Sequence, residues 1–299
     1  MNGRTALVDG DILVYLAGFA SQKTIWTHMP SGEWFEGKEA ANKWFKEEND
    51  APKVGIMKWM KENWKDDEWD SEIVVEPWSN CQFIIDNKLR ECMQVNDCHD
   101  IRVFLTPKTT FRHALAVTKE YKGNRKDTPK PVYKDEITKY LKESWGAETG
   151  DNIEADDLLG INQTTNTVIC SNDKDLRMIP GEHYNFAPKK EDEQQFHLMD
   201  ELGGDRWFFV QLIAGDSTDN IQGIPGYGVA KAEKIVDEFL DDGDWHGLAG
   251  EIEELYCQHY PANYREALEE HAALVWILHA GETPETAGWR DLLHEVSEA

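Results

Sequence analysis

Four short stretches of the sequence contain acidic residues whose types and spacing could bind metal ions. The acids are Asp9, Glu154, Asp156, Asp157, Asp173, Asp175, Asp216 and Asp219. Carboxylates gathered at one place repel each other, which raises their pKa values unless cations neutralise them. Carboxylate oxygens select Mg²⁺ or Mn²⁺, and two such ions about 4 Å apart can activate a water and stabilise the leaving oxygen in phosphodiester cleavage.

A glycine-rich loop directly follows the last of these acids. In the stretch GDSTDNIQGIPGYGVAKAEKIV, Gly223, Gly226 and Gly228 permit positive φ angles and close backbone approach. The helix expected after the loop presents free N–H groups, and Lys231 and Lys234 can add charge contacts. Loops of this type hold phosphate groups through backbone dipoles without reading base sequence. The segment therefore predicts phosphate binding beside a metal site.

The elements that must position these residues follow an alternating pattern. Short apolar runs at 5–8, 101–105 and 167–170 predict strands, and stretches such as 205–214 predict helices. This alternation favours an α/β fold with a central, mostly parallel sheet flanked by helices, whose carboxyl edge carries the functional residues. Within the helix expected over 151–161, Glu154 and Asp157 are three residues apart and share a face, and Asp156 points about 160° away from Glu154. The three cannot aim at one point unless the helix start is distorted.

Residues 22–80 have an unusual composition, because seven tryptophans lie among many charged residues. A turn signal at 30–32 between two short runs predicts a hairpin, and 38–64 has a helical pattern. Aromatic residues at such spacing more often pack a core than stack on bases. We therefore favour a core here, with base stacking as the alternative.

Charge is distributed unevenly along the chain. The formal net charge of the 299 residues is −26, but residues 102–142 hold eleven Lys and Arg against four Asp and Glu, a net +7 that leaves −33 elsewhere. Such asymmetry points to a localised anionic partner, and a solvated surface of mixed charge is the alternative. The five cysteines are odd in number and irregularly spaced, which argues against a disulfide framework. No apolar run suggests a membrane span, and we expect a cytoplasmic protein (host cytoplasm if it is viral).

The motifs together resemble the 5′-nuclease family, which includes phage 5′→3′ exonucleases, flap endonucleases and the 5′-nuclease domain of bacterial DNA polymerase I. The matching stretches occur in the family's order and are LVDGD (7–11), FR…EYKGNRK (111–126), IEADDLLG (153–160), SNDKDL (171–176) and GDSTDNIQGIPGYGVAKAEKIV (215–236). The resemblance implies an α/β nuclease domain over 1–200 with a helical arch near 106–145. It also implies a helical domain over 201–299 with a helix–three-turn–helix motif that binds DNA.

Roles for individual residues follow from the resemblance alone. Asp9, Glu154, Asp156 and Asp157 would surround a first metal ion, and Asp173, Asp175, Asp216 and Asp219 would serve a second ion or its water shell. Tyr121, Lys122 and Arg125 would be catalytic residues at the foot of the helical arch, where the substrate strand threads and the lysine and arginine touch the scissile phosphate. Arg112, Lys126, Gly223, Gly226, Gly228, Lys231 and Lys234 would contact DNA, with K⁺ at the glycine hairpin.

One departure from the family pattern bears on the metal sites. The family usually has an Asp shortly after the strand at 101–105, but the chain has no carboxylate between Asp100 and Glu120. Either another acid, such as Asp11, substitutes for it, or one metal site is weaker. Loss of one charge should lower metal affinity before it abolishes chemistry.

We therefore expect a monomeric enzyme that uses two Mg²⁺ or Mn²⁺ ions to hydrolyse phosphodiester bonds at the 5′ ends or flaps of duplex DNA in phage replication. RNA primers in RNA–DNA hybrids are a further candidate substrate. A duplex-binding protein that keeps the fold but has lost turnover is the main alternative. An acidic mimic of DNA, suggested by the charge of −26, is a second alternative and leaves the glycine loop unexplained.

Overall fold

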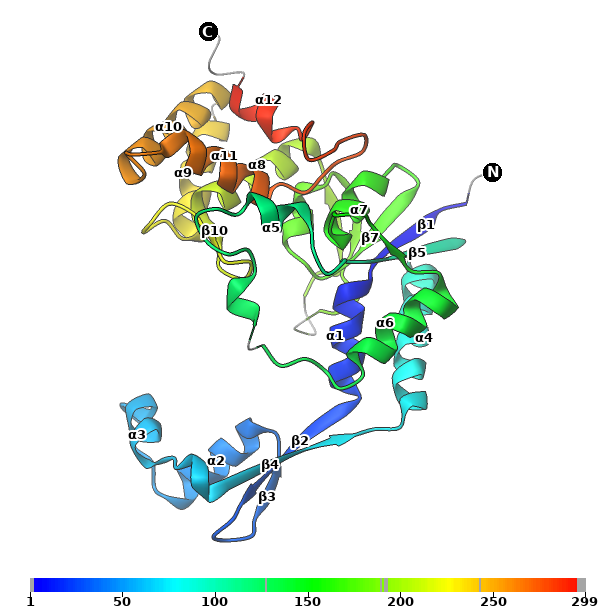
Figure 1. Ribbon diagram of the computed structural model, residues 1–299, viewed down its shortest axis with the longest axis vertical. Helices are drawn as coiled ribbons and strands as arrows, with labels where there is room; N and C mark the ends of the chain where they lie inside the picture. The colour runs from blue at the N-terminus through cyan, green and yellow to red at the C-terminus, as the bar shows by residue number, and fades with distance from the viewer. Residues whose placement is uncertain (1–2, 127, 189, 191–192, 242, 295–299) are drawn as a thin grey trace. The chain divides into compact units, whose positions relative to one another are not determined.

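The computed structural model describes residues 3–126, 128–188, 190, 193–241 and 243–294 (Figure 1). The expected arch and the expected helical domain also include residues 127, 242 and 295–299, which lie outside the described residues. The chain divides into two compact units. The first comprises 1–13, 87–129 and 138–299, and the second comprises 14–86 and 130–137.

The first unit is built around a six-stranded sheet in the order β6-β5-β1-β7-β8-β9. The strands are β1 (Thr5–Asp9), β5 (Asp100–Leu105), β6 (Glu148–Thr149), β7 (Thr167–Cys170), β8 (Gly181–Tyr184) and β9 (Phe196–Met199). Every pairing is parallel except that of β8 with β9, so the predicted mostly parallel sheet is confirmed. Val8 in the central strand pairs with Val103 on one side and Cys170 on the other, and all three side chains are buried.

Helices flank this sheet and continue beyond it (Figure 1). They are α1 (Gly10–Ala20), α4 (Trp78–Val95), α5 (Phe111–Leu115), α6 (Lys134–Trp145), α7 (Ala155–Asn162), α8 (Glu201–Ala214), α9 (Val229–Asp241), α10 (Trp245–His259), α11 (Tyr264–Val275) and α12 (Trp289–His294). The helix expected from residue 151 begins later, because Glu154 caps α7 and the residues before it are not helical.

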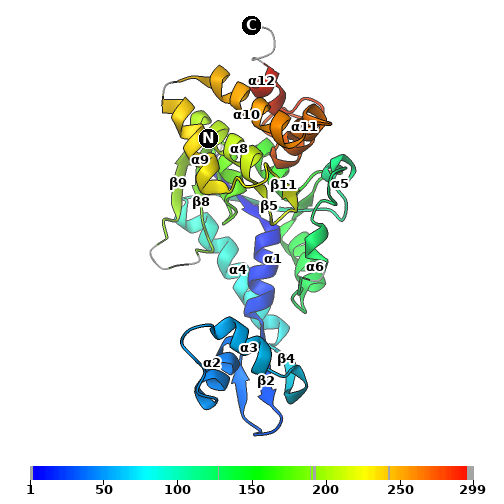
Figure 2. The same ribbon diagram turned by 90° about the vertical axis from the view of Figure 1, so that its left-hand side faces the viewer.

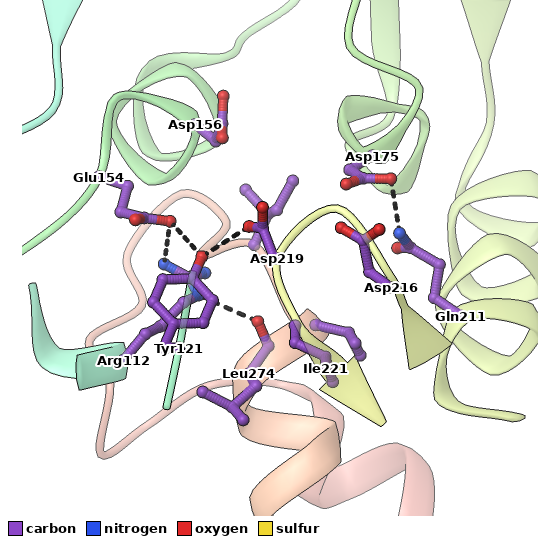
Figure 3. Close-up of a pocket in the computed structure, with 12 residues that line it drawn as sticks. Arg112, Tyr121, Glu154, Asp156, Asp175, Gln211, Asp216, Asp219, Ile221 and Leu274 are labelled. Carbon is purple, nitrogen blue, oxygen red and sulfur yellow. Dashed lines mark hydrogen bonds and ion pairs between the residues drawn. The ribbon is translucent and has the colours of Figure 1, made fainter. Parts of the chain in front are cut away.

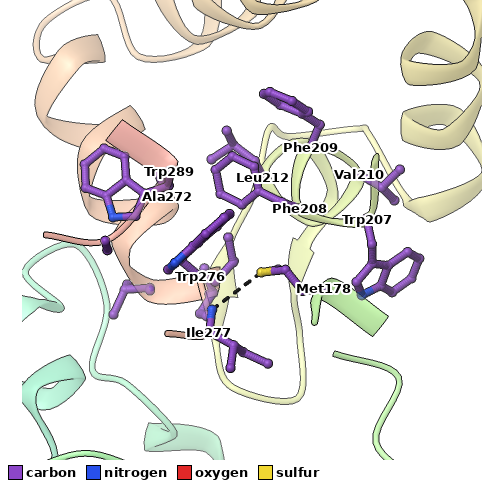
Figure 4. Close-up of a cluster of buried hydrophobic side chains, with 14 of the residues drawn as sticks. Met178, Trp207, Phe208, Phe209, Val210, Leu212, Ala272, Trp276, Ile277 and Trp289 are labelled. Carbon is purple, nitrogen blue, oxygen red and sulfur yellow. Dashed lines mark hydrogen bonds between the residues drawn. The ribbon is translucent and has the colours of Figure 1, made fainter. Parts of the chain in front are cut away.

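One hydrophobic cluster connects the sheet with the C-terminal helices. Helix α8 lies at its centre, because eight of its residues are buried and apolar side chains extend all around it. Figure 4 shows Phe208 facing Trp276, and these two rings meet edge to face with centroids 5.0 Å apart. The boundary expected near residue 200 stays a prediction, although this cluster includes side chains from both sides of it.

The second unit contains a three-stranded antiparallel sheet in the order β3-β2-β4. Its elements are β2 (Gln22–His28), β3 (Trp34–Glu36), α2 (Lys38–Glu48), α3 (Ile56–Asn63) and β4 (Trp69–Val75) (Figure 2). The hairpin expected around residues 30–32 is the β2–β3 connection, and the expected helical stretch is two helices. The sequence did not indicate β4, in which Trp69 is buried while Asp70, Glu72 and the other residues up to Val74 are exposed.

Aromatic side chains form the core of this second unit. Phe45 and Trp69 are buried, and Trp26, Trp44, Trp59 and Trp64 pack against them. Trp64 stacks on Trp69 with ring centroids 4.3 Å apart. The predicted core role is confirmed for these residues, whereas Trp34 on the outer face of β3 is 65% exposed.

Candidate active site

Asp9 lies at the carboxyl end of β1, where the chain turns directly into α1. Glycine is required at position 10, because a Cβ there would lie 2.5 Å from the Phe104 carbonyl oxygen. Asp9 is 3% exposed, and its carboxylate accepts hydrogen bonds from the Ile12 N–H at 3.1 Å and the Ser171 hydroxyl at 2.8 Å. Burial and the nearby Asp11 raise the pKa of Asp9 to about 7. The Asp9 carboxylate therefore binds a proton readily unless a cation takes the place of that proton.

Asp11 lies in the first turn of α1 and faces the strand end from which the family's acid is missing. Its Oδ2 accepts the backbone N–H of Thr106 at 3.1 Å. The pKa of Asp11 is raised, mainly by burial and also by the charge of Glu154. The hydrogen bonds from Thr106 and the charge of Lys122 act in the opposite direction. An acid outside the expected set thus lies beside the residue that follows β5.

Glu154 and Asp156 flank the start of α7. Glu154 is 3% exposed, and its carboxylate lies 2.8 Å from both the Tyr121 hydroxyl and the Lys122 ammonium. Burial opposes its ionisation, but Arg112 and Lys122 outweigh burial and lower the pKa of Glu154. Asp156 shows the opposite behaviour, because burial and the charges of Asp9, Asp173 and Glu154 raise its pKa well above the usual value.

Asp157 has no exposed surface and is engaged on all sides by protein donors. Its two oxygens accept both terminal nitrogens of Arg112, at 2.6 and 2.8 Å. They also accept the backbone N–H groups of Glu154 at 3.0 Å and Leu278 at 3.1 Å. As expected for the first and third acids of this helix, Glu154 and Asp157 share a face. With its lone pairs occupied in this way, Asp157 is placed to fix the start of α7 rather than to bind a cation.

Arg112 differs from its expected place at a DNA surface. Its side chain is 3% exposed, and besides Asp157 it donates to the carbonyl oxygens of Leu274 at 3.1 Å and Trp276 at 2.5 Å. The guanidinium thus connects α5, α7 and the segment that follows α11. The sequence could not reveal this, because the partner carbonyls lie more than 160 residues away.

The second group of acids comes from the loop after β7 and from the β10–β11 turn. Here β10 is Gly215–Asp216 and β11 is Ile221–Gln222. Asp173 accepts the backbone N–H of Asp175 at 2.9 Å, and Asp216 accepts that of Thr218 at 2.8 Å. Burial and the charges of Asp173 and Asp216 raise the pKa of Asp175 to about 8. Its Oδ1 accepts Nε2 of Gln211 from α8 at 2.6 Å.

The expected catalytic residues connect the two acidic groups. Tyr121 is 5% exposed, and its hydroxyl lies 2.8 Å from Glu154 and 2.8 Å from Asp219. Lys122, which has a φ of 55°, is 3.5 Å from Asp219, and Arg125 also forms an ion pair with Asp219. Burial raises the pKa of Asp219, and the two cations act in the opposite direction.

Figure 3 shows that the acids from α7, the β7 loop and the β10–β11 turn surround one pocket. Glu154, Asp156, Asp175, Asp216 and Asp219 line it. As they are placed, no three His, Cys, Asp or Glu side chains of the described residues form a group that could hold a metal ion. Mg²⁺ needs fewer protein ligands than such a group supplies, because it usually takes one or two carboxylates and keeps several waters. The oxygen-only donor set and the repulsion that raises the pKa of Asp175 and Asp156 fit such a hydrated cation.

The glycine loop lies beside this pocket and forms a second hollow with Lys119 and Asn220. Gly226 has a φ of 84° and Gly228 does not have a positive φ, and a Cβ at either would meet no atom within 4 Å. Both are exposed, so a phosphate backbone can approach them closely. Gly223 is different, because it is buried and packs directly against the backbone of Gly215.

The charged residues near this loop are distributed over its exposed side. Lys231 and Lys234 are exposed in the first turns of α9, and the Lys231 ammonium lies 3.3 Å from the centroid of the Tyr227 ring. Lys126 is exposed and forms an ion pair with Glu120 at 2.7 Å. These residues lie outside the acidic pocket, where they are accessible to a polyanion.

Two residues of the site escaped the sequence reasoning. Gln211 lies in the pocket wall, but in the sequence it is one polar residue in an apolar helix and has no motif around it. Thr106 hydrogen-bonds both Asp11 and, through its hydroxyl at 3.0 Å, the Ala155 N–H at the start of α7. Its position directly after a strand was the available signal, but the prediction for that position considered only acidic residues.

Comparisons with known proteins agree with this arrangement. A 5′-3′ exonuclease of Buchnera aphidicola subsp. Acyrthosiphon pisum is 31% identical over 173 residues, which are 52% of this chain and 58% of that protein. The exodeoxyribonuclease of Enterobacteria phage T3 is 31% identical over 144 residues, 45% of this chain and 46% of that protein. DNA polymerase I of Bacillus caldotenax is 26% identical over 199 residues, 60% of this chain and 21% of that protein. The chain thus matches less than two thirds of the length of each, and no family model matches it.

The solved structures give a match over nearly the whole chain. The T5 D15 protein co-crystallised with metal ions aligns with 98% of this chain and 97% of its own, with a TM-score of 0.54 and 17% identity. The T5 5′-exonuclease with bound zinc aligns with 99% of this chain and 97% of its own, with a TM-score of 0.51 and 17% identity. At this identity the match establishes the fold. The resemblance carried by the sequence motifs is thus confirmed, and in sequence and in fold the chain is a relative of the 5′-nuclease family.

Proposed function

We propose that the protein hydrolyses phosphodiester bonds at the 5′ ends or flaps of duplex DNA, with two Mg²⁺ or Mn²⁺ ions held in the acidic pocket. The observation that carries this proposal is the meeting of five acids from three separate segments in one pocket beside Lys122 and Arg125. Bound cations would balance these carboxylates when Lys122 and Arg125 turn to a substrate. The relatives named as exonucleases support the same reaction.

Each part of the site has a task in this reaction. When bound, the divalent ions would supply an activated water and neutralise charge at the scissile phosphate. Lys122 and Arg125 would bind that phosphate and counter the charge that develops on it. Tyr121 would hold Glu154 and Asp219 in place, because its hydroxyl lies 2.8 Å from each. Asp157, through Arg112, would fix the start of α7 and so the position of Asp156.

Binding of the substrate requires an exchange of partners. In the structure Lys122 pairs with Glu154 at 2.8 Å, and Arg125 pairs with Asp219. A DNA phosphate that takes these cations leaves both acids without a counter-charge, and divalent ions can then replace the lysine and arginine. Ion binding and DNA binding should therefore strengthen each other.

The exposed glycines of the hairpin would hold the duplex through its backbone, with K⁺ as the proposed ion there. Because such contacts do not read bases, RNA–DNA hybrids are a proposed second substrate. Among the described residues, no helix combines the length and the apolar character needed to cross a membrane. A monomeric state and a cytoplasmic location stay predictions.

The test is cleavage of a 5′-labelled flap duplex with Mg²⁺ by the intact protein, by Asp173→Ala and by Asp151→Ala. Asp173 does not line the acidic pocket itself, but its charge raises the pKa of both Asp9 and Asp175, whereas Asp151 is an exposed acid before α7. We expect Asp173→Ala to lose at least about a hundredfold in cleavage rate and Asp151→Ala to cut like the intact protein. Equal cleavage by all three proteins would contradict the assignment of the metal site.

A further inference from the structure

Among the polar residues that line the acidic pocket, Gln211 is the one for which neither the motifs nor the proposed reaction provides a role. It lies on α8, it is 3% exposed, and its Nε2 donates to Oδ1 of Asp175 at 2.6 Å. Its Oε1 is also buried and has no hydrogen-bond partner among the described residues. Figure 3 shows the amide between Asp175 and Asp216, with its nitrogen toward Asp175.

A second buried glutamine shows what an ordinary structural amide looks like in this protein. Gln163 is 7% exposed, its Nε2 donates to the Glu182 carbonyl at 3.2 Å, and its Oε1 accepts the Thr167 hydroxyl at 2.7 Å. Both ends of its amide are satisfied, as is usual for buried polar groups. An unpaired buried acceptor such as Gln211 Oε1 costs stability unless a ligand pairs with it.

Reversal of the Gln211 amide does not remove the problem when Asp175 is ionised, which is its state beside a bound cation. A reversed amide would then place its oxygen against the Asp175 carboxylate, and two acceptors cannot share a hydrogen bond. Gln211 lines a pocket whose other polar residues include carboxylates from three segments. A cation is the partner that satisfies an amide oxygen and neighbouring carboxylates together, since Mg²⁺ and Mn²⁺ are bound by such oxygens.

We propose that Gln211 takes part in cation binding by Asp175 and Asp216. Its Nε2 fixes the Asp175 carboxylate, and its Oε1 supplies a neutral oxygen to the cation that these two acids hold. This inference rests on the proposed function, because it assumes a divalent cation in the pocket. It adds a residue outside the acidic motifs and assigns separate tasks to the two ends of one side chain.

The two tasks can be separated by substitution. Gln211→Met keeps a similar volume and removes both the N–H donor and the oxygen, whereas Gln211→Glu keeps an oxygen at the same position, removes the donor and adds a negative charge. Mn²⁺ is the probe, and its free signal in electron paramagnetic resonance measures the affinity and the number of bound ions without DNA or turnover. Gln163→Met controls for the loss of a buried amide, and Gln94→Glu on the exposed face of α4 controls for the added charge.

We expect Gln211→Met to bind the lower-affinity Mn²⁺ ion at least about tenfold less tightly than the intact protein does. Gln211→Glu should bind this ion as tightly as the intact protein or more tightly. Both controls should bind Mn²⁺ as the intact protein does. If Gln211→Glu loses as much affinity as Gln211→Met, the amide only orients Asp175 and the inference is wrong. It is also wrong if Gln211→Met binds normally. If the intact protein itself binds no Mn²⁺, the proposed metal-dependent reaction fails as well, so the two failures are distinguishable.

Discussion

Arg112 and Arg206 each hold an aspartate through two nitrogen atoms, but they do so in different surroundings. Arg112 grips Asp157 in the interior, where the side chains are 3% and 0% exposed. Arg206 grips Asp237 at the surface, at 2.6 and 2.9 Å, with 31% and 47% of the side chains exposed. Both pairs are bidentate, Arg112 through its two terminal nitrogens and Arg206 through Nε and one terminal nitrogen, but only Arg112 is buried and bonded to main-chain carbonyls as well.

At the residue scale we therefore predict unequal costs for the loss of these arginines. Arg112→Leu leaves Asp157 charged, buried and unpaired, which should lower the free energy of unfolding by about 3–5 kcal/mol. Arg206→Leu removes a screened surface pair and should cost less than about 1 kcal/mol. Urea unfolding measures both. Equal losses would show that Asp157 finds another partner and that the Arg112 connection is not what fixes α7.

At the scale of elements, the three glycines of the hairpin have distinct structural roles. Gly223 packs against the backbone of Gly215, Gly226 is open but has a φ of 84°, and Gly228 is open without a positive φ. A motif read from the sequence treats the three alike. The structure separates close packing, backbone conformation and open access.

These roles predict a graded response to alanine. Gly223→Ala forces the loop away from the end of α8 and should lower the free energy of unfolding by more than about 2 kcal/mol. Gly226→Ala should cost about 1 kcal/mol because of its left-handed conformation, and Gly228→Ala should cost nothing measurable. Denaturant unfolding of the three variants gives the order. A destabilised Gly228→Ala would refute this assignment of roles.

Sequence reasoning predicted the elements best where local pattern and tertiary structure agree. The runs that became β1, β5 and β7 are short, apolar and buried on both faces, so their composition alone marks them as strands of a parallel sheet. Strand β4 was missed because its residues Asp70, Glu72 and Val74 face away from the aromatic core, and an edge with that many charges has no strand signal.

The sequence predicted which acids belong to the site, but it did not predict the separate role of each acid. Spacing along the sequence indicated that Glu154 and Asp157 share a face, but not that the buried Arg112 occupies Asp157. Gln211 could not be found, because its importance depends on an unpaired atom next to Asp175, and that is visible only in three dimensions.

At the scale of the whole molecule, the second unit has a core of its own. The aromatic cluster around Phe45 and Trp69 shares no described residue with the cluster that underlies the acidic pocket. The two ends of the segment that carries β2, β3 and β4 are adjacent, since Gln22 pairs with Val75. If the residues between these two ends, here called the insert, are removed, a two-residue hairpin turn can therefore join Gln22 to Val75.

We predict that replacement of residues 23–74 by Asn-Gly leaves a folded protein with the Mn²⁺ affinity of the intact chain. Asn-Gly is the turn that suits a hairpin closed directly between paired strand ends. Circular dichroism reports folding, and the Mn²⁺ titration reports the pocket. A shortened protein that folds but no longer binds Mn²⁺ would show that the insert contributes to the site.

The net charge of −26 and the basic segment have opposite effects on a DNA partner. In the proposed reaction, DNA would have to reach Lys122 and Arg125 against the repulsion of the remaining chain, so binding would depend on a few local contacts and on cations in the pocket. Divalent ions are therefore central to the proposal that a strongly acidic protein acts on a polyanion.

The most direct measurement compares binding and cleavage of one 5′-flap duplex by the intact protein, first in EDTA and then after Mg²⁺ is restored in excess. We predict that the duplex is bound weakly and stays intact in EDTA, and that it is bound more tightly and cut near the flap junction once Mg²⁺ is present. Cleavage that persists in EDTA would contradict the metal-dependent site. A bound duplex that stays uncut at saturating Mg²⁺ and Mn²⁺ would instead identify a DNA-binding protein without turnover.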